Sequence, residues 1–348
     1  MRRRSRGFLG KKILSICLCT SMVLCSAVPN IVRASDQIPE ESTPALGDTI
    51  VTNDGTRDNL WKLVWQDEFN GTELDTTKWG YQVGDGSTYG IAGWGNSELQ
   101  YYTDDGNNVS FEEGKLVITA KKNNDSNKYQ GASYTSGRIW TKGSIDASDQ
   151  GTPALFTKKY GRFEAKISMP EGTGYWPAFW MMPTYDKYGS WALSGEIDIM
   201  EARGRLVNQV GGTLHYGGSW PNNKYMGGHY TSESFRITDE HVYALEWLPG
   251  IMRWYVDDIL FYETNDWYSK RDGNPVNYTY PAPFDQEFYL MLNLAVGGNY
   301  DGGQLDTALD NRQMKIDYVR VYDLEGQTYD ENVLPPTVQP DPLPEGVP

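Results

Sequence analysis

The chain has 348 residues, a formal net charge of −15, and 13% aromatic residues. An apolar content of 39% can fill a sizeable core, which excludes a wholly disordered chain, and the length allows one large or two ordinary domains. The excess of acidic residues argues against a nucleic-acid or anionic-membrane binder, because phosphate contacts need clustered Lys and Arg.

Residues 1–34 have the pattern of a secretory signal peptide. A basic head precedes a mostly apolar run, residues 13–28, and Ala34 is a small residue suited to cleavage. The run is shorter than the roughly 20 residues that span a bilayer, which favours cleavage over a retained membrane anchor. A lipoprotein alternative would use Cys25, but Leu24 stands where a small residue is needed. We therefore expect a secreted, extracellular protein without a membrane anchor.

All three cysteines lie in this leader, at Cys17, Cys19 and Cys25. Cleavage would leave a mature chain with no disulfide, no thiol nucleophile and no zinc–thiolate site. The leader also holds seven of the 31 basic residues and no acidic ones, so its loss changes the net charge from −15 to −22. We expect a monomer with no nucleic-acid and no membrane partner.

Two polar segments flank the central part of the chain. Residues 35–60 form a polar lead-in, and residues 324–348 form a Pro-rich tail with six prolines in the last fourteen residues. Such a stretch can neither pair into a sheet nor continue a helix, so it is either a linker or a plain tail. Residues 61–323 are left as the predicted catalytic domain.

Short strand-like runs fill that domain. Apolar and charged residues alternate over residues 160–167, residues 252–262 read as a hairpin turning at Asp257-Asp258, and residues 314–322 are rich in β-branched and aromatic side chains. No long segment keeps a helical period. The pattern predicts an all-β domain, a single antiparallel β-sandwich.

The strand most suited to chemistry is residues 196–201, Glu-Ile-Asp-Ile-Met-Glu. Glu196 and Asp198 share one face of a strand, and the isoleucines between them face the other way. Strict alternation would send Glu201 to the apolar side. A one-residue bulge near Ile199 or Met200 would return it beside the other two acids, and bulges are common next to active sites. The spacing alone does not exclude a solvated acidic edge.

Carboxylates on one face raise each other's pKa, because like charges resist joint ionisation. One acid can then stay ionised as a nucleophile while its neighbour stays protonated, which is the division of labour that glycosidic cleavage requires. Tryptophans just before this strand, Trp176 and Trp180 among them, suit stacking on sugar faces, although each could equally pack in the core.

At this point a family resemblance is evident. Residues 194–204, Ser-Gly-Glu-Ile-Asp-Ile-Met-Glu-Ala-Arg-Gly, resemble the signature of glycoside hydrolase family 16 in its laminarinase (endo-1,3-β-glucanase) branch. Further blocks resemble the family in the expected order over residues 61–323: 63–71, 94–103, 134–138, 174–180, 212–217 and 316–322.

The resemblance implies a jelly-roll sandwich with a cleft on one sheet and a retaining hydrolase of β-glucan polysaccharides. It assigns Glu196 as nucleophile, Glu201 as acid/base and Asp198 as the residue that orients the nucleophile. The spacing that includes Met200 is similar to laminarinases rather than lichenases, although some galactan-degrading members share it. The same resemblance places five residues in the sugar-binding cleft: Asn96, Arg138, Trp176, Trp180 and His215.

Three histidines and one metal site complete the expectations. His215 has a structural histidine as its alternative, and His229 and His241 are expected to be structural. No catalytic cofactor is expected. Three positions resemble a family calcium site away from the cleft: Glu68, the backbone carbonyl of Gly114, and Asp317. Hard oxygen ligands suit calcium, but a carboxylate satisfied by protein hydrogen bonds is the alternative.

Two other functions stay open on the sequence. Mixed-linkage 1,3-1,4-β-glucan cleavage depends on the shape of the cleft, which spacing does not reveal. A non-catalytic β-glucan-binding protein could use the same sandwich, since fold does not fix function. Intact acids at Glu196, Asp198 and Glu201 favour the enzyme over the binder.

Overall fold

The computed structural model describes residues 60–123, 130–143, 152–270, 273, 276–306, 311–326 and 328–336, all within one compact unit, Asp48–Pro348. The predicted signal peptide, nearly all of the lead-in, and residues 337–348 of the Pro-rich tail lie outside the described residues. Within the described part of the chain, no helix has the length and apolar character needed to cross a membrane.

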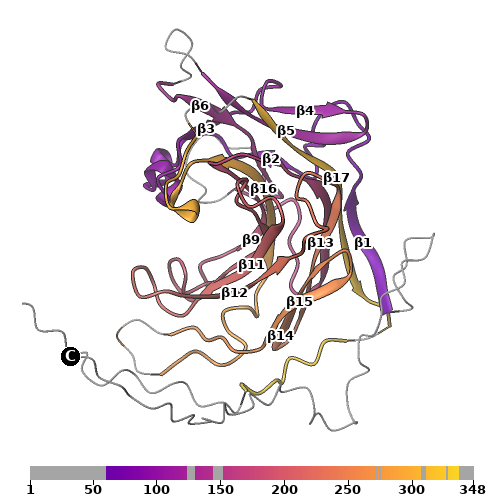
Figure 1. The fold of residues 1–348 in the computed structure, drawn as a ribbon. Helices are drawn as coiled ribbons and strands as arrows, with labels where there is room; N and C mark the ends of the chain where they lie inside the picture. The colour runs from indigo at the N-terminus through magenta and orange to yellow at the C-terminus, as the bar shows by residue number, and fades with distance from the viewer. Residues whose placement is uncertain are drawn as a thin grey trace, which may run out of the picture. The chain divides into compact units, whose positions relative to one another are not determined.

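The described strands form two sheets, seen as layers in Figure 1. The ten-stranded sheet has the order β15 (Ile259–Thr264), β14 (Ile251–Val256), β13 (His241–Leu248), β8 (Gly161–Ser168), β17 (Arg312–Leu324), β5 (Lys115–Lys122), β6 (Tyr134–Ser136), β3 (Gln100–Tyr102), with β1 (Trp61–Asp67) beside β17 and β4 (Val109–Glu112) beside β5. The seven-stranded sheet has the order β12 (Lys224–Thr231), β11 (Gln209–Tyr216), β10 (Glu196–Glu201), β9 (Tyr175–Pro183), β16 (Phe288–Val296), β7 (Arg138–Trp140), β2 (Gly80–Tyr81). Among these pairs only β3 and β6 run parallel, so the predicted antiparallel sandwich of jelly-roll type is confirmed.

The predicted hairpin is also confirmed. β14 and β15 pair directly, and the turn between them consists of Asp257 and Asp258. Both aspartates have positive φ, 48° and 64°. Two consecutive left-handed residues give the turn whose twist matches that of paired strands, and aspartate tolerates this conformation better than most residues do.

The apolar core lies between the two sheets. β8 sends Phe163, Ala165 and Ile167 into it, as the alternation predicts. On the opposite face of β8, Arg162 and Glu164 are also buried, and Arg162 makes ion pairs with Glu164 at 3.2 Å and with Glu246 of β13 at 3.0 Å. Mutual neutralisation and hydrogen bonding make burial of these charges tolerable.

The end of the domain differs slightly from the predicted boundary at residue 323. β17 ends at Leu324, and part of the predicted tail packs on the domain. The Tyr329 ring lies 5.2 Å from that of Tyr160, and its hydroxyl donates to Asp323.

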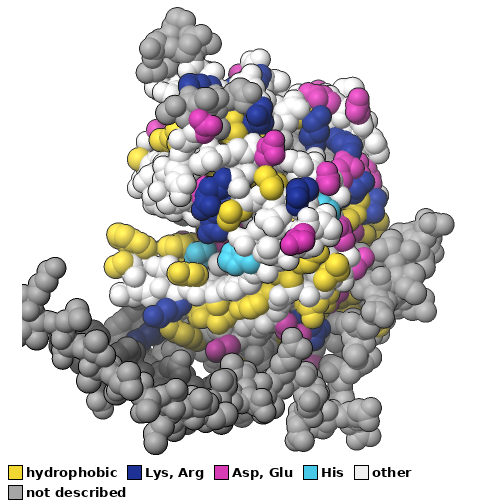
Figure 2. Space-filling model, in the orientation of Figure 1, with side chains coloured by type: hydrophobic (Ala, Val, Ile, Leu, Met, Phe, Trp, Pro, Cys, Tyr) yellow, Lys and Arg dark blue, Asp and Glu magenta, His cyan; other side chains and the backbone are white. Residues whose placement is uncertain are grey.

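The seven-stranded sheet has one face on the core and one face on a hollow. β16 lies near its middle and is buried along its whole length, Phe-Tyr-Leu-Met-Leu-Asn-Leu-Ala-Val. Figure 2 shows the hollow, which holds histidine side chains and has a band of hydrophobic side chains along its lower rim. β9, β10 and β11 lie side by side in this sheet, and the predicted catalytic residues are on β10.

Candidate active site

A bulge in β10 determines which residues reach the hollow. Asp198 pairs with Thr213 of β11, but Glu201 pairs with Gly211, so two residues of β10, Ile199 and Met200, oppose one residue of β11, Gly212. The register against β9 shifts at the same place. Ile199 and Met200 both pack in the core at 2% and 0% exposure. The predicted bulge is thus confirmed, and it returns Glu201 to the face of Glu196 and Asp198.

A tryptophan from the other sheet holds the bulge. The indole N–H of Trp254 on β14 donates to the backbone carbonyl of Asp198 at 2.9 Å. The indole packs against Gly212 of β11, where an added Cβ would be 2.3 Å from its ring carbon Cδ1. Glycine is therefore required at residue 212, and the catalytic strand is attached through the core to the opposite sheet.

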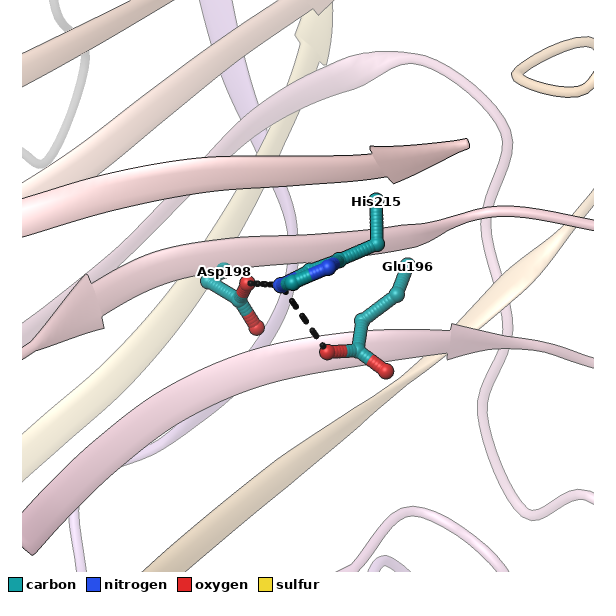
Figure 3. Close-up of side chains that lie close together, drawn as sticks. All are labelled: Glu196, Asp198 and His215. Carbon is teal, nitrogen blue, oxygen red and sulfur yellow. Dashed lines mark ion pairs between the residues drawn. The ribbon is translucent and has the colours of Figure 1, made fainter. Parts of the chain in front are cut away.

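His215 lies beside the first two acids, as Figure 3 shows. It pairs with Glu196 across β10 and β11, and its Nε2 lies 3.3 Å from Asp198 Oδ2 and 3.7 Å from Glu196 Oε1. The approach to Asp198 is not aligned as a hydrogen bond, since Oδ2 of this buried carboxylate has no hydrogen-bond partner among the described residues. One potential ligand atom from each of these three residues lies within 4.8 Å of the other two, so among the residues that the structure describes they form a group that could surround a metal ion.

Each of the two glutamates accepts a hydrogen bond from its own tryptophan. Trp191 Nε1 donates to Glu196 Oε2 at 2.7 Å, and Trp176 Nε1 donates to Glu201 Oε1 at 2.9 Å. Hydrogen bonds to an ionised group are among the stronger ones in proteins. Trp191 was not among the predicted site residues, although its place five residues before Glu196 in an aromatic stretch was a usable signal.

The surroundings raise the pKa of both glutamates. Burial, followed by the charge of Asp198, raises the pKa of Glu196 to about 7 and that of Glu201 to about 8. Burial lowers the pKa of His215, but the neighbouring carboxylates, Glu196 foremost, outweigh it and raise the pKa to about 9. Near neutral pH the site can therefore hold an ionised Glu196, a protonated Glu201 and a cationic imidazole.

The predicted sugar-binding residues extend from this centre across the sheet. Trp176 and Trp180 are half-buried on the hollow face of β9, and Trp180 Nε1 donates to Asn293 Oδ1 of β16 at 2.7 Å. Asn293 pairs with Arg138 of β7. Asn96 ends the short 3-10 helix η3 (Ala92–Gly95), and its carbonyl accepts from the N–H of Asn299 at 2.8 Å.

Arg138 lies among aromatic rings. Its guanidinium carbon is 4.2 Å from the ring centre of Trp94, 4.6 Å from that of Tyr102 and 5.4 Å from that of Trp180. It also donates to Gln82 Oε1 at 3.2 Å. Cation–π contacts of this kind fix a guanidinium firmly. Arg138 thus braces Trp180 and is itself buried, at 5% exposure.

The three predicted calcium positions meet around a bulge of β17. Register places Glu68 just beyond β1, Gly114 just before β5, and Asp317 at the bulge between them. The Glu68 carboxylate makes two hydrogen bonds with Arg320, and Asp317 Oδ2 accepts from Lys166 at 2.8 Å. Calcium bound through these carboxylates would displace those cations, so the side chains favour the protein-satisfied alternative, and calcium stays a prediction.

The other two histidines differ in role. His241 bonds through its two ring nitrogens to Asp257 and to the carbonyl of Arg236, which fits the structural role predicted for it. His229 of β12 pairs with Gly211, the partner of Glu201, and its ring covers that glycine. The sequence predicted only a structural role for His229 and did not place it next to the strand partner of Glu201.

Comparisons with known proteins agree with this geometry. Residues 96–320 match the family described as glycosyl hydrolases family 16. The chain is 46% identical over 275 residues to glucan endo-1,3-beta-glucosidase A1 of Niallia circulans, covering 75% of this chain but 37% of that protein. It is 41% identical over 271 residues to a beta-glucanase of Rhodothermus marinus, covering 75% and 85% of the two chains. The X-ray structure of a laminarinase from Rhodothermus marinus superposes with a TM-score of 0.63 at 40% identity, over 76% of this chain and 98% of that one.

Proposed function

Because the chain belongs to glycosyl hydrolases family 16 and is therefore a glycoside hydrolase, we propose that it cleaves 1,3-β-glucosidic bonds within β-glucan chains, with retention of anomeric configuration. One observation carries the proposal. The bulge in β10 brings Glu196, Asp198 and Glu201 to one face, and each glutamate there has its own indole donor. Two carboxylates with separate environments suit an acid and a nucleophile.

In the first step the Glu196 carboxylate attacks the anomeric carbon as the bond from that carbon to the leaving oxygen breaks. Glu201 gives its proton to that oxygen, so the shortened glucan leaves as a neutral alcohol. The product is a glycosyl ester on Glu196. The pKa order fits these roles, because Glu196, with a pKa of about 7, loses its proton before Glu201, with a pKa of about 8.

In the second step Glu201, now ionised, takes a proton from water. The water oxygen bonds to the anomeric carbon, and Glu196 leaves as a carboxylate. Two displacements from opposite sides restore the original configuration. Trp191 favours the departing carboxylate of Glu196 by its hydrogen bond, and cationic His215 offsets the negative charge that Asp198 adds beside it.

The residues across β9, β16 and β7 suit a flat sugar polymer. Half-buried indoles at Trp176 and Trp180 present ring faces, and Arg138 and Asn293 add polar groups in the same row. Sugars bind proteins by stacking on aromatic rings combined with a few oriented hydrogen bonds. An open, hollow sheet also allows a long chain to lie across it, which supports internal cleavage.

Release of reducing ends is the direct test. Laminarin, lichenan and agarose are incubated in parallel with the purified protein, and we expect laminarin to be cleaved fastest. Faster cleavage of lichenan would assign a mixed-linkage glucanase instead. Binding of laminarin without release from any β-glucan would show a binding protein and refute the enzyme mechanism.

The assignment of the nucleophile has its own test. Glu196→Gln removes the negative charge but keeps the shape, so turnover should fall to background while laminarin binding persists. Normal turnover in that variant would show that Glu196 is not the nucleophile. NMR of the first product formed by the unaltered protein should show the β anomer, and an initial α anomer would refute retention.

A further inference from the structure

A short loop packs against the tryptophan that hydrogen-bonds Glu201. This loop, residues 297–303, directly follows β16 and contains the 3-10 helix η4 (Asn299–Asp301). The Tyr300 ring stacks on the Trp176 ring with 4.9 Å between centroids and an interplanar angle of 21°. A Cβ at Gly298, whose φ is +89°, would lie 3.0 Å from the same indole. Backbone and side chain of the loop therefore both press on Trp176.

The loop is held from the other side by residues that follow the catalytic strand. The guanidinium of Arg203 lies 3.9 Å from the centre of the Tyr300 ring, and its Nε donates to the Tyr300 carbonyl at 2.9 Å. Arg205 donates to Asp301 Oδ1 at 2.7 Å, and Asp301 is 5% exposed. Asp301 is buried while Arg205 is exposed, and a charge-assisted hydrogen bond of this kind is stronger than a neutral one, so it helps to fix the loop.

This series of contacts leads to Glu201, the proposed proton donor. Trp176 is only half-buried at the edge of the hollow, so its ring needs an external support to keep one orientation. With Tyr300 stacked on it, its N–H points at Glu201 Oε1 at 2.9 Å. We propose that Tyr300 is a positioning residue that acts through Trp176 on the acid/base Glu201. This inference rests on the proposed function of Glu201.

Other groups around Glu201 bear on its titration. Glu196 and Asp198 of β10 and His215 of β11 act on Glu201 directly, and the Tyr300 phenol of η4 lies within its electrostatic reach. Arg203 and Asp301 lie around Tyr300, and the His229 ring of β12 covers Gly211, the strand partner of Glu201. A substitution of Tyr300 that releases the Trp176 ring leaves all the other groups chemically unchanged. A change in the titration of Glu201 on loss of the stack therefore reports on the Trp176 hydrogen bond.

The experiment compares Tyr300→Leu, which removes the stack, with Tyr300→Phe, which keeps it. Each variant is assayed on laminarin and on a 2,4-dinitrophenyl β-laminaribioside, whose phenolate leaves without a proton. General acid catalysis contributes about 10²- to 10⁴-fold, so a misaligned acid in the leucine variant should lower kcat/KM on laminarin by roughly 10- to 100-fold. The aryl substrate should lose less than about threefold, because it bypasses the acid. Tyr300→Phe should behave as the unaltered protein on both.

The pH profile gives a second readout. The Trp176 hydrogen bond favours ionised Glu201, so loosening it raises the pKa of Glu201, and the alkaline limb of kcat/KM should move to higher pH in Tyr300→Leu and stay in place in Tyr300→Phe. Equal losses on both substrates, or an unmoved alkaline limb, would overturn the proposal.

Two controls distinguish a failure of the proposal from misfolding of the variant and from a wrong acid/base assignment. Activity on the aryl substrate certifies that Tyr300→Leu is folded with an intact nucleophile, and an inactive leucine variant is replaced by Tyr300→Met, to which the same criteria apply. Glu201→Gln must itself lose far more activity on laminarin than on the aryl substrate. If it does not, the acid/base assignment fails, and the failure lies in the proposed function rather than in the role of Tyr300.

Discussion

Replacing Trp191 by phenylalanine should raise the pKa of Glu196 and slow catalysis on the acid side. The substitution keeps an aromatic ring but removes the N–H that donates to Glu196 Oε2 at 2.7 Å. That hydrogen bond favours the ionised carboxylate and so lowers the pKa. Without it, Glu196 holds its proton to a higher pH and is a poorer leaving group in the second step.

The size of the effect follows from the burial of the pair. A hydrogen bond to a charged group contributes about 1.5–3 kcal/mol, and about 1.4 kcal/mol corresponds to one pKa unit. The Glu196 side chain keeps 16% of its exposure, so water replaces part of the lost bond. We therefore expect the acid limb of kcat/KM to move up by about one pH unit.

The assay is kcat/KM on laminarin across the pH range, with Trp176→Phe as the matched control. Catalysis needs Glu196 ionised and Glu201 protonated, so the acid limb reports the pKa of Glu196 and the alkaline limb that of Glu201. Trp191→Phe should move only the acid limb to higher pH and so narrow the bell-shaped pH profile. Trp176→Phe should move only the alkaline limb to higher pH and so widen the profile.

Two results would refute this reasoning. An acid limb that stays in place in Trp191→Phe would mean that the indole does not stabilise the ionised nucleophile. Movement of the alkaline limb by Trp191→Phe, with the acid limb moved by Trp176→Phe, would mean that the roles of Glu196 and Glu201 are exchanged.

Three other predictions concern stability and processing. Arg162→Met leaves Glu164 and Glu246 buried without their cation, so urea denaturation should show a loss of about 3–5 kcal/mol in unfolding free energy, and a loss under about 1 kcal/mol would contradict this reading. If calcium binds around Asp317, calcium chloride should raise Tm above its value in EGTA, and Asp317→Asn should abolish the difference; equal Tm values in the unaltered protein would argue against the site. Protein collected from the medium of a secreting host should begin at residue 35, and an intact residue 1 there would contradict cleavage.

Much of the site follows from local pattern, because strand alternation acts over a few residues. The acids and isoleucines of β10 already require a bulge if all three carboxylates are to share a face, and the register shift after Asp198 provides it. The turn at Asp257-Asp258 is local in the same sense. Such features need only neighbours in the chain.

Contacts between distant segments were not predictable in this way. Tyr300 and Trp176 are more than a hundred residues apart in the chain, and no local pattern of residues predicts that their rings stack. Arg162 and Glu164 occupy the face of β8 that alternation makes polar, yet both are buried, because Arg162 pairs with Glu164 and also with Glu246 from another strand. The predicted carboxylate ligand Glu68 is likewise matched by Arg320 from β17.

The bond from Trp254 to the Asp198 carbonyl matters for anyone who recombines this enzyme with its relatives. A chimera made by a crossover between β11 and β14 takes these two strands from different parents. Here the donor belongs to one layer, while the acceptor Asp198 and the permissive Gly212 belong to the other. A chimera that inherits a larger residue at 212 with this tryptophan displaces the catalytic strand. Positions 198, 212 and 254 therefore form one inheritable unit, and crossover points are best chosen to keep all three from the same parent.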